Sequence, residues 1–315
     1  MKSSNRIRHK ILEPVYRKYV YHKRSKDFPV TLDIELTNDC NLSCVMCARI
    51  LMKRKVGYMS EELLNKIIDE AKNYHLDSIG LHLFGEPLMH PDIVGFISRI
   101  KQDFKATPLL LSTNGFFLNS AISAGIIKSG LDIIRFSVDG DNKKTYEKVR
   151  IGSDYDKVVQ NINGFLKIRD ELGANSPHIQ MQILNMADTG SDIAEFTKRW
   201  RPFLREYDKI LIQPFMTFAG RISDRTPFKT ATLKDRIKRS FPCLRLWKNL
   251  VVYWDGRVSA CCYDVDGELL IGDINSETIF EIWNGKKLQE LRAVHLEGRK
   301  PVFALCRSCL RQKTD

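Results

Sequence analysis

The sequence contains no uninterrupted apolar run of about 18 residues, the length that a membrane-spanning helix requires. It also lacks the apolar segment of a signal peptide near its start, because Glu13, Pro14, Arg17 and Lys18 interrupt the stretch ILEPVYRKYV. No low-complexity tract is present, and no repeat beyond a strand–helix period. These absences argue against membrane-spanning and secreted proteins, so we expect a cytoplasmic protein without a membrane span.

Acidic residues are scarce in the first 26 residues, which hold nine Lys or Arg and one Glu in a 315-residue chain of net charge +12. Tyr16, Tyr19 and Tyr21 alternate with these basic residues. The pattern suits an anionic partner, such as a nucleic acid, an anionic membrane surface or an acidic peptide. The alternative is a solvated helix that lies against the main domain, because runs of charge usually face water.

From about residue 30, strand-like and helix-like segments alternate. The strand-like segments are 30–37, 78–85, 109–115, 132–140, 178–185 and 209–215, and the helix-like segments are 60–74, 91–104, 119–129, 154–172 and 191–207. This alternation is typical of βαβ units around a parallel sheet. A complete eight-unit barrel needs about 250 residues, whereas six units fit this stretch. We therefore expect an α/β fold, a partial (β/α)6 TIM-like barrel followed by a small C-terminal α+β domain.

The predicted boundaries are a basic N-terminal segment at 1–28, the barrel at 29–220, a polar linker at 221–242 and the C-terminal domain at 243–315. In this last domain, 249–262 predicts a β-hairpin that turns at Asp255-Gly256, and 276–295 predicts one amphipathic helix.

Three thiols, Cys40, Cys44 and Cys47, directly follow the first predicted strand. In a parallel α/β fold, the chemistry lies at the carboxyl ends of the strands. Structural zinc needs four ligands, and no fourth Cys or His lies near this trio in the sequence. Three thiolates suit instead a 4Fe-4S cluster whose fourth iron stays open to a small molecule.

The CX3CX2C spacing of Cys40, Cys44 and Cys47 resembles that of the radical S-adenosylmethionine (SAM) superfamily. The resemblance implies that SAM chelates the open iron of a 4Fe-4S cluster and is cleaved reductively to a 5′-deoxyadenosyl radical, which abstracts hydrogen from an unactivated C–H. It also implies a flavodoxin- or ferredoxin-type electron donor. Met46 stands where the family often has an aromatic residue.

Further segments resemble the SAM-contacting motifs of this superfamily. Gly85-Glu86-Pro87 is similar to its GGEP motif, with Phe84 in place of the first Gly. The resemblance implies that SAM is bound by residues on four loops, namely Gly85, Glu86, Pro87, Ser112, Asn114, Ser137 and Arg150. Turn and cap roles are the alternative for Ser112, Asn114 and Asp139, and a surface ion pair is the alternative for Arg150.

Four of the other five cysteines, Cys243, Cys261, Cys306 and Cys309, complete a possible four-thiolate site. The step from Gly256 to Cys261 resembles the GX4C step of SPASM and twitch domains, which implies one auxiliary 4Fe-4S cluster. A zinc ribbon is the alternative. Cys262 is left over, either as a catalytic hydrogen-atom donor, as a small buried hydrophobe or as an alternative cluster ligand.

The leading prediction is a radical SAM enzyme that oxidises or epimerises a sugar, aminocyclitol or similar small molecule. The first alternative is a radical SAM enzyme that modifies a peptide or protein, whose acidic leader the basic segment could hold; the lack of a visible leader-binding domain before residue 30 weighs against it. The distant alternative is a zinc-stabilised nucleic-acid-binding protein, although we do not expect a nucleic acid as partner.

Overall fold

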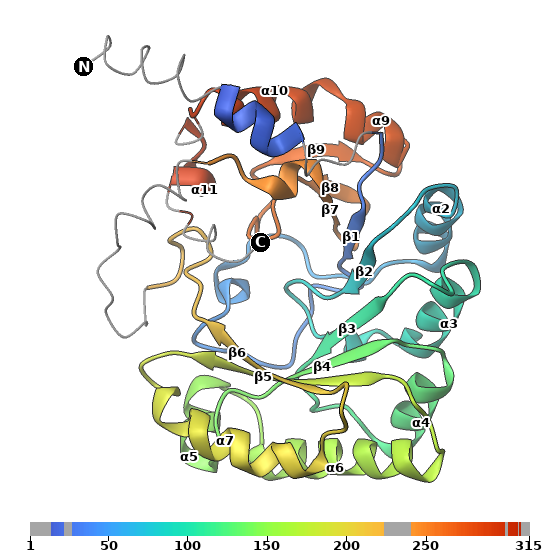
Figure 1. Ribbon diagram of the computed structural model, residues 1–315, viewed down its shortest axis with the longest axis vertical. Coiled ribbons are helices and arrows are strands. Elements are labelled where there is room, and N and C mark those ends of the chain that lie inside the picture. Colours follow the sequence, from blue (N-terminus) through green and yellow to red (C-terminus); the bar gives the residue numbers. More distant parts are fainter. Residues whose placement is uncertain (1–13, 22–26, 224–240, 300–301, 308, 310–315) are drawn as a thin grey trace.

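The computed structural model describes residues 14–21, 27–223, 241–299, 302–307 and 309. A nine-stranded sheet in the order β6-β5-β4-β3-β2-β1-β7-β8-β9 runs through this part of the chain (Figure 1). The first six strands are all parallel, which confirms the predicted α/β partial barrel. They are β1 (Thr31–Ile34), β2 (Ser78–Leu81), β3 (Leu109–Thr113), β4 (Ile133–Ser137), β5 (His178–Asn185) and β6 (Lys209–Pro214).

Helices cover the convex face of the barrel strands (Figure 1). They are α2 (Glu61–Ala71), α3 (Ile93–Asp103), α4 (Ser120–Lys128), α5 (Lys143–Val149), α6 (Tyr155–Glu171) and α7 (Ile193–Trp200), with the short helices η1 (Ala48–Leu51), η2 (Pro87–Met89), η3 (Gly190–Asp192) and η4 (Arg201–Phe203). The Ser60 side chain accepts a hydrogen bond from the Leu63 N–H and begins α2, as its cap position predicts. The sequence analysis did not predict α5, whose segment KKTYEKV is short and mostly polar.

Side chains alternate between the two faces of the strands. Leu111, Phe136 and Met181 point to the helices and are fully buried in the main core. Ser112 and Gln180 alternate with them and face the concave side, which we call the lumen. On β3, β4 and β5 the lumen side chains are only partly buried, so this part of the sheet is left for a ligand rather than for a helix.

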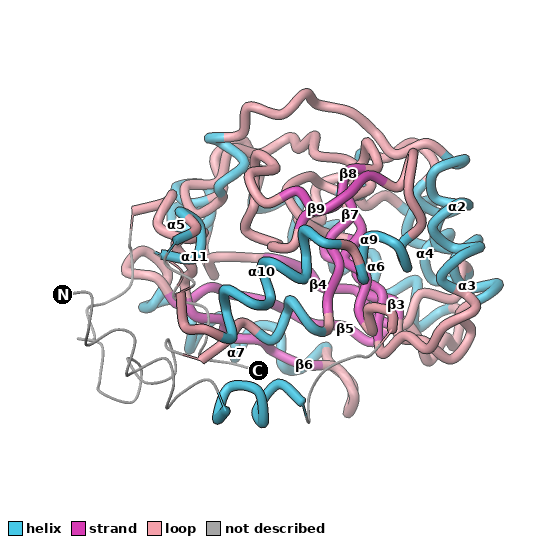
Figure 2. The backbone as a smooth tube through the Cα atoms, turned by 90° about the horizontal axis from the view of Figure 1, so that it is seen from above, coloured by secondary structure: helices cyan, strands magenta, loops and turns pink. Residues whose placement is uncertain are grey.

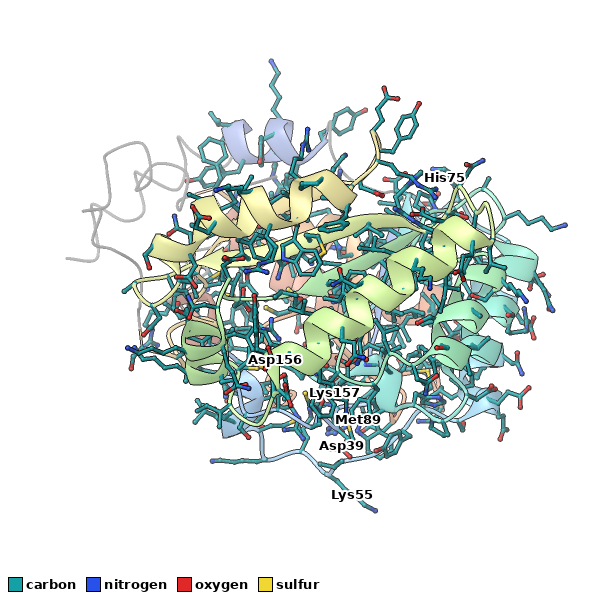
Figure 3. The ribbon with its side chains drawn as sticks, turned by 90° about the horizontal axis from the view of Figure 1, so that it is seen from below. Asp39, Lys55, His75, Met89, Asp156 and Lys157 are labelled. Carbon is teal, nitrogen blue, oxygen red and sulfur yellow. The ribbon has the colours of Figure 1, made fainter. Side chains whose placement is uncertain are left out.

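The connections that follow the parallel strands gather at one edge of the molecule, where Figure 2 shows mostly loops. Asp39, after β1, and Met89, after β2, lie at one edge, whereas His75, before β2, lies at the opposite edge (Figure 3). The predicted motifs after β1, β2, β3 and β4 therefore share one rim.

The C-terminal module extends the barrel sheet. Its elements are η5 (Leu244–Trp247), β7 (Asn249–Val252), β8 (Arg257–Ser259), β9 (Leu270–Asp273), α9 (Ile279–Asn284), α10 (Lys286–Leu296) and α11 (Ala304–Arg307). β7 pairs in parallel with β1, and β8 runs antiparallel to both β7 and β9. The hairpin turns at Asp255-Gly256 as predicted, with Gly256 at a φ of 89°.

Two predictions for this module need correction. The helix predicted over 276–295 is wrong as one element, because Gly285 at ψ 157° separates α9 from α10. β9 was not predicted, since its four residues, LIGD, give too short a pattern. The division of the chain into four segments stays a prediction, and most of the predicted linker lies outside the described residues.

Residues 14–21 form a helix beside α10 (Figure 1). Tyr16 and Val20 are buried, and the Tyr16 and Tyr19 rings lie 5.1 Å from the Phe241 ring. This part of the basic segment therefore packs against the main domain, as the helical alternative predicts. Within the described residues, no helix is long and apolar enough to cross a membrane.

Candidate functional site

The three-cysteine loop lies on the rim next to the segment that ends α5. The N–H groups of Ser43 and Val45 donate to the carbonyls of Ile151 and Val149, at 2.9 and 3.0 Å. The loop turns back on itself, because the Cys47 N–H donates to the Cys44 carbonyl at 3.1 Å. Apolar side chains surround the thiols, including Leu42, Met46 and Phe84. The backbone thus holds Cys40, Cys44 and Cys47 together in a largely water-free setting.

Burial raises the pKa of the Cys40 and Cys44 thiols to about 11 and also raises the pKa of Cys47. Buried thiols of this kind become thiolates when a metal compensates their charge. In the described part of the chain, no three His, Cys, Asp or Glu side chains converge as the ligands of a single ion do. A 4Fe-4S cluster needs a wider spacing, because each thiolate binds a different iron. Three soft donors on one apolar loop therefore fit such a cluster.

Glu86 of the GEP motif turns into the protein. Its carboxylate accepts hydrogen bonds from the Leu88 N–H at 3.0 Å, the Thr113 hydroxyl at 2.6 Å and the Asn114 N–H at 2.7 Å. Burial raises its pKa, and these hydrogen bonds oppose that rise. Glu86 therefore joins the loops after β2 and β3, and its predicted contact with SAM stays a prediction.

Gly85 brings the GEP loop against the loop after β1. A Cβ atom at Gly85 would lie 2.0 Å from the Thr37 carbonyl oxygen and 2.8 Å from the Asp39 carbonyl oxygen. The Glu86 N–H donates to this Asp39 carbonyl at 2.7 Å. The absence of a side chain thus allows two rim loops to touch, and Pro87 begins η2 directly after them.

Asn114 links the loop after β3 to the cysteine loop. Its Nδ2 donates to Asn41 Oδ1 at 3.0 Å and lies 4.0 Å from the Cys40 sulfur. Its Oδ1 accepts from the Phe116 N–H at 2.9 Å, so the turn role expected as the alternative is also present. Ser112 lies two residues earlier on the lumen face of β3.

Arg150 lies behind the cysteine loop, and Ser137 ends β4 on the lumen side. The Nε and Nη2 of Arg150 donate to Asp139 Oδ2 at 3.0 and 2.6 Å, and the Leu184 N–H donates to Asp139 Oδ1 at 2.7 Å. Burial disfavours the charged guanidinium, but Asp139 and Cys44 favour it and raise its pKa. The ion pair expected as an alternative therefore exists, but it is buried rather than on the surface.

Sequence reasoning missed Arg54, which connects the rim to the C-terminal module. Its guanidinium donates to both Glu35 oxygens at 2.8 and 2.9 Å and to the Val265 carbonyl at 2.7 Å. It also lies over the Tyr253 ring, 3.9 Å from the centroid. No sequence signal marks Arg54, because its partners are 19 or more positions away.

The C-terminal cysteines gather beside η5. Cys261 interacts electrostatically with Cys262, Cys243 and Cys309, and burial raises the pKa of Cys261 and Cys243. Cys306 joins them through the buried side chain of His295, whose Nε2 lies 3.6 Å from the Cys306 sulfur and whose Nδ1 accepts from the Cys243 N–H at 3.3 Å. The sequence analysis missed His295. The assignment of individual cysteines as cluster ligands stays a prediction.

Comparisons with known proteins agree with this geometry. The sequence profile of the radical SAM superfamily matches residues 34–170, and that of SPASM, an iron-sulfur cluster-binding domain, matches residues 243–310. The chain belongs to the radical SAM superfamily. It is therefore a radical SAM enzyme that uses SAM and a 4Fe-4S cluster and has a C-terminal SPASM iron-sulfur domain. This match favours an iron-sulfur site over the alternative zinc ribbon, while the prediction of one auxiliary cluster remains a prediction.

Individual relatives are distant. The tungsten-containing aldehyde ferredoxin oxidoreductase cofactor-modifying protein of Pyrococcus furiosus is 27% identical over 53% of this enzyme and 47% of its own length. The structure of BtrN in complex with AdoMet and 2-DOIA has a TM-score of 0.61 at 18% identity and covers 90% of this enzyme and 94% of BtrN. Streptococcus suis SuiB bound to the precursor peptide SuiA has a TM-score of 0.67 at 12% identity, over 88% of this enzyme and 69% of SuiB. The enzyme spans about half the length of the curated relative.

Proposed function

We propose that the enzyme oxidises or epimerises an unactivated C–H of a sugar, an aminocyclitol or a similar polyol. The observation that carries this proposal is the set of polar side chains on the lumen face of the sheet. Half-buried hydroxyl and amide side chains, Ser112, Ser137, Gln180 and Gln182, line it on three neighbouring strands. Such groups match the hydroxyls of a polyol, because a buried hydroxyl needs a hydrogen-bond partner. The likeness to BtrN over 94% of that chain supports a small-molecule ligand.

When bound, SAM and the clusters supply hydrogen-atom abstraction and an acceptor for a second electron, so that a secondary alcohol gives a ketone after loss of two electrons and two protons. The protein contributes position and a dry environment. Asn114 and Arg150 would hold the SAM end of the site, and the apolar side chains around the cysteine loop exclude water. A flavodoxin- or ferredoxin-type protein would supply electrons.

Peptide modification is the second candidate function. The likeness to SuiB bound to its precursor peptide, at a TM-score of 0.67, favours it. The basic N-terminal segment would then contact an acidic leader. Because Tyr16 and Val20 are buried, deletion of residues 1–13 tests this contact without removing the helix at 14–21. A polyol enzyme should keep its turnover after this deletion, whereas a leader-dependent enzyme should lose it.

The decisive experiment is anaerobic incubation of the reconstituted enzyme with SAM, a reductant and deuterated polyols, followed by mass spectrometry. Deuterium in 5′-deoxyadenosine would identify the substrate and the attacked carbon. A product that has lost one deuterium and one hydrogen indicates oxidation, and a product in which one solvent hydrogen replaces one deuterium indicates epimerisation. Deuterium transfer from labelled peptides, with none from the polyols, would overturn the proposal.

A further inference from the structure

One cation on the lumen face has no carboxylate partner among the described residues. Arg135 lies in the middle of β4, in register with Ser112 on β3 and with Gln180 on β5. Parallel strands that are covered on both faces are usually apolar throughout, and the lumen of a full barrel is filled by branched apolar side chains. A guanidinium at the centre of this face therefore differs from the usual apolar pattern, and the fold itself does not require it.

The hydrogen bonds of Arg135 use only part of its donor set. Its Nε and Nη2 both donate to the same atom, Gln180 Oε1, at 2.9 and 2.7 Å. Among the residues that the structure describes, no carboxylate lies within ion-pair distance of its guanidinium, and burial lowers its pKa. The Nη1 side of the fork is thus open to an acceptor in the lumen.

Four other arginines are more deeply buried than Arg135, which is only partly buried on the lumen face. Three of them pair with carboxylates: Arg54 with Glu35, Arg150 with Asp139, and Arg169 with Asp208. Arg292 donates to the backbone carbonyls of Leu246 and Trp283 and lies over the Trp283 ring. Among the described residues, Arg292 also has no carboxylate partner, but it is enclosed by the protein, whereas Arg135 faces the lumen, where an anion from outside the chain can reach it and offset the cost of its partial burial.

In the part of the chain that the structure describes, the acids on and just after β1 do not supply that anion. Asp33 on β1 faces the lumen, but its oxygens contact His82 at 3.3 Å and Arg245 at 3.2 Å. Glu35, the next lumen-facing acid on that strand, is held by Arg54. Within the described residues, Glu35 and Asp33 are thus each paired with another arginine, and neither forms an ion pair with Arg135.

We propose that the substrate carries a carboxylate or phosphate group, which the guanidinium of Arg135 binds in the lumen between Ser112 and Gln180. The inference rests on the proposed function and narrows it to anionic polyols, such as sugar acids or sugar phosphates. A planar guanidinium binds both groups through two parallel hydrogen bonds. Ser137 lies two residues further along β4, about 6–7 Å nearer the rim. The anionic group therefore lies level with Ser112 and deeper in the barrel than the other predicted SAM contacts.

Binding of the isolated groups tests this inference before the substrate is known. Inorganic phosphate and acetate are titrated anaerobically into the reconstituted enzyme with SAM, and their line widths are followed by ³¹P and ¹³C NMR. We expect saturable binding of one of them, weakened about tenfold or more in Arg135→Gln and less in Arg135→Lys, which keeps the charge but loses the planar fork. The matched control is Arg201→Gln, which removes one exposed positive charge on η4 and should bind like the wild type.

The phosphate and acetate arms tell a phosphorylated substrate from a carboxylated one. Equal affinities in the wild type and Arg135→Gln, or no saturable binding in the wild type, would overturn the inference. Formation of 5′-deoxyadenosine without substrate is measured in parallel and should persist in Arg135→Gln. If the identified substrate is a neutral polyol, the anion inference fails but the proposed function stands. If the substrate is a peptide, the proposed function itself is overturned.

Discussion

The rim side chains differ in how many of their hydrogen bonds are already made to other residues of the protein. Glu86 accepts three hydrogen bonds and Arg150 donates two to Asp139, so both shape the rim from inside. The sequence motif identifies these residues, but it cannot tell which way a carboxylate turns. That depends on Thr113 and Asn114, which come close only when β2 and β3 pair.

Replacement of Glu86 by Gln should destabilise the enzyme, because the amide nitrogen would face an N–H or O–H donor. The expected loss is about 1–3 kcal/mol in the free energy of unfolding, the cost of a buried donor without a partner. Urea unfolding followed by tryptophan fluorescence measures it. Glu62→Gln on the exposed face of α2 is the control and should change stability by less than about 0.5 kcal/mol. Equal midpoints for the two variants would contradict the inward role of Glu86.

Cys262 lies beside Cys261 and Cys243, and its predicted role is that of a hydrogen-atom donor to the substrate. If it is the donor, Cys262→Ala should abolish epimerisation while 5′-deoxyadenosine still forms. Analysis of product stereochemistry and of iron content separates this outcome from loss of a cluster ligand. Unchanged turnover in Cys262→Ala would remove the catalytic role.

At the scale of elements, the alternation of strand-like and helix-like segments identifies all six barrel strands. The elements that were missed or merged have a local cause. α5 has only Tyr146 and Val149 as buried residues, which is too few to set a helical period. α9 and α10 are separated at Gly285. Helix propensity alone predicts that a Gly weakens a helix, but not that the helix ends there.

Gly85 fixes the distance between two rim loops, so Gly85→Ala should separate them and lower both cluster content and SAM cleavage about tenfold or more. The reason is the 2.0 Å approach of a Cβ atom to the Thr37 carbonyl, which is backbone and cannot turn away. Gly164→Ala in α6 is the matched control, because its Cβ would meet nothing within 4 Å. This control should gain about 0.5–1 kcal/mol of stability through helix propensity. Normal iron content and activity in Gly85→Ala would refute the close contact.

The edge strand β6 is held by Asp208, which lies just before it. Burial opposes ionisation of Asp208, but hydrogen bonds from Arg169 and from the N–H groups of Ile179 and Arg205 outweigh it and lower its pKa. A lowered pKa means that the carboxylate stabilises the fold above the ordinary pKa of Asp and that this stabilisation is lost as the pH falls. Asp208→Asn should therefore be less stable than the wild type at pH 7, with a difference that shrinks below about pH 4. Urea midpoints from pH 7 to pH 3 check this, and a constant difference would contradict it.

At the scale of the whole molecule, one guanidinium ties three regions together. Arg54 comes from the rim segment after η1, Glu35 from the end of β1, and Val265 and Tyr253 from the C-terminal module. Sequence motifs predict the two modules and their cysteines but not this contact, because its partners share no short pattern. The same holds for the charge balance of the lumen, which depends on strand register.

Arg54→Met should cost about 3–5 kcal/mol in the free energy of unfolding, because it leaves the Glu35 carboxylate buried without its partner. The double variant Arg54→Met/Glu35→Leu removes both charges and should recover much of that loss. Urea unfolding of the two variants gives the comparison. A double variant no more stable than the single one would show that packing over Tyr253, rather than the ion pair, holds the regions together.

The parallel pairing of β7 with β1 makes the first barrel strand an interior strand rather than an outer one. A fragment that stops before residue 243 would expose the main-chain N–H and C=O groups along Thr31–Ile34, a strand whose side chains are mostly buried. Exposed strands of this kind recruit other chains by hydrogen bonding. Separating the two modules should therefore yield insoluble aggregates rather than a partly active barrel. The SPASM module thus covers the edge of the barrel sheet at β1, in addition to carrying iron and sulfur.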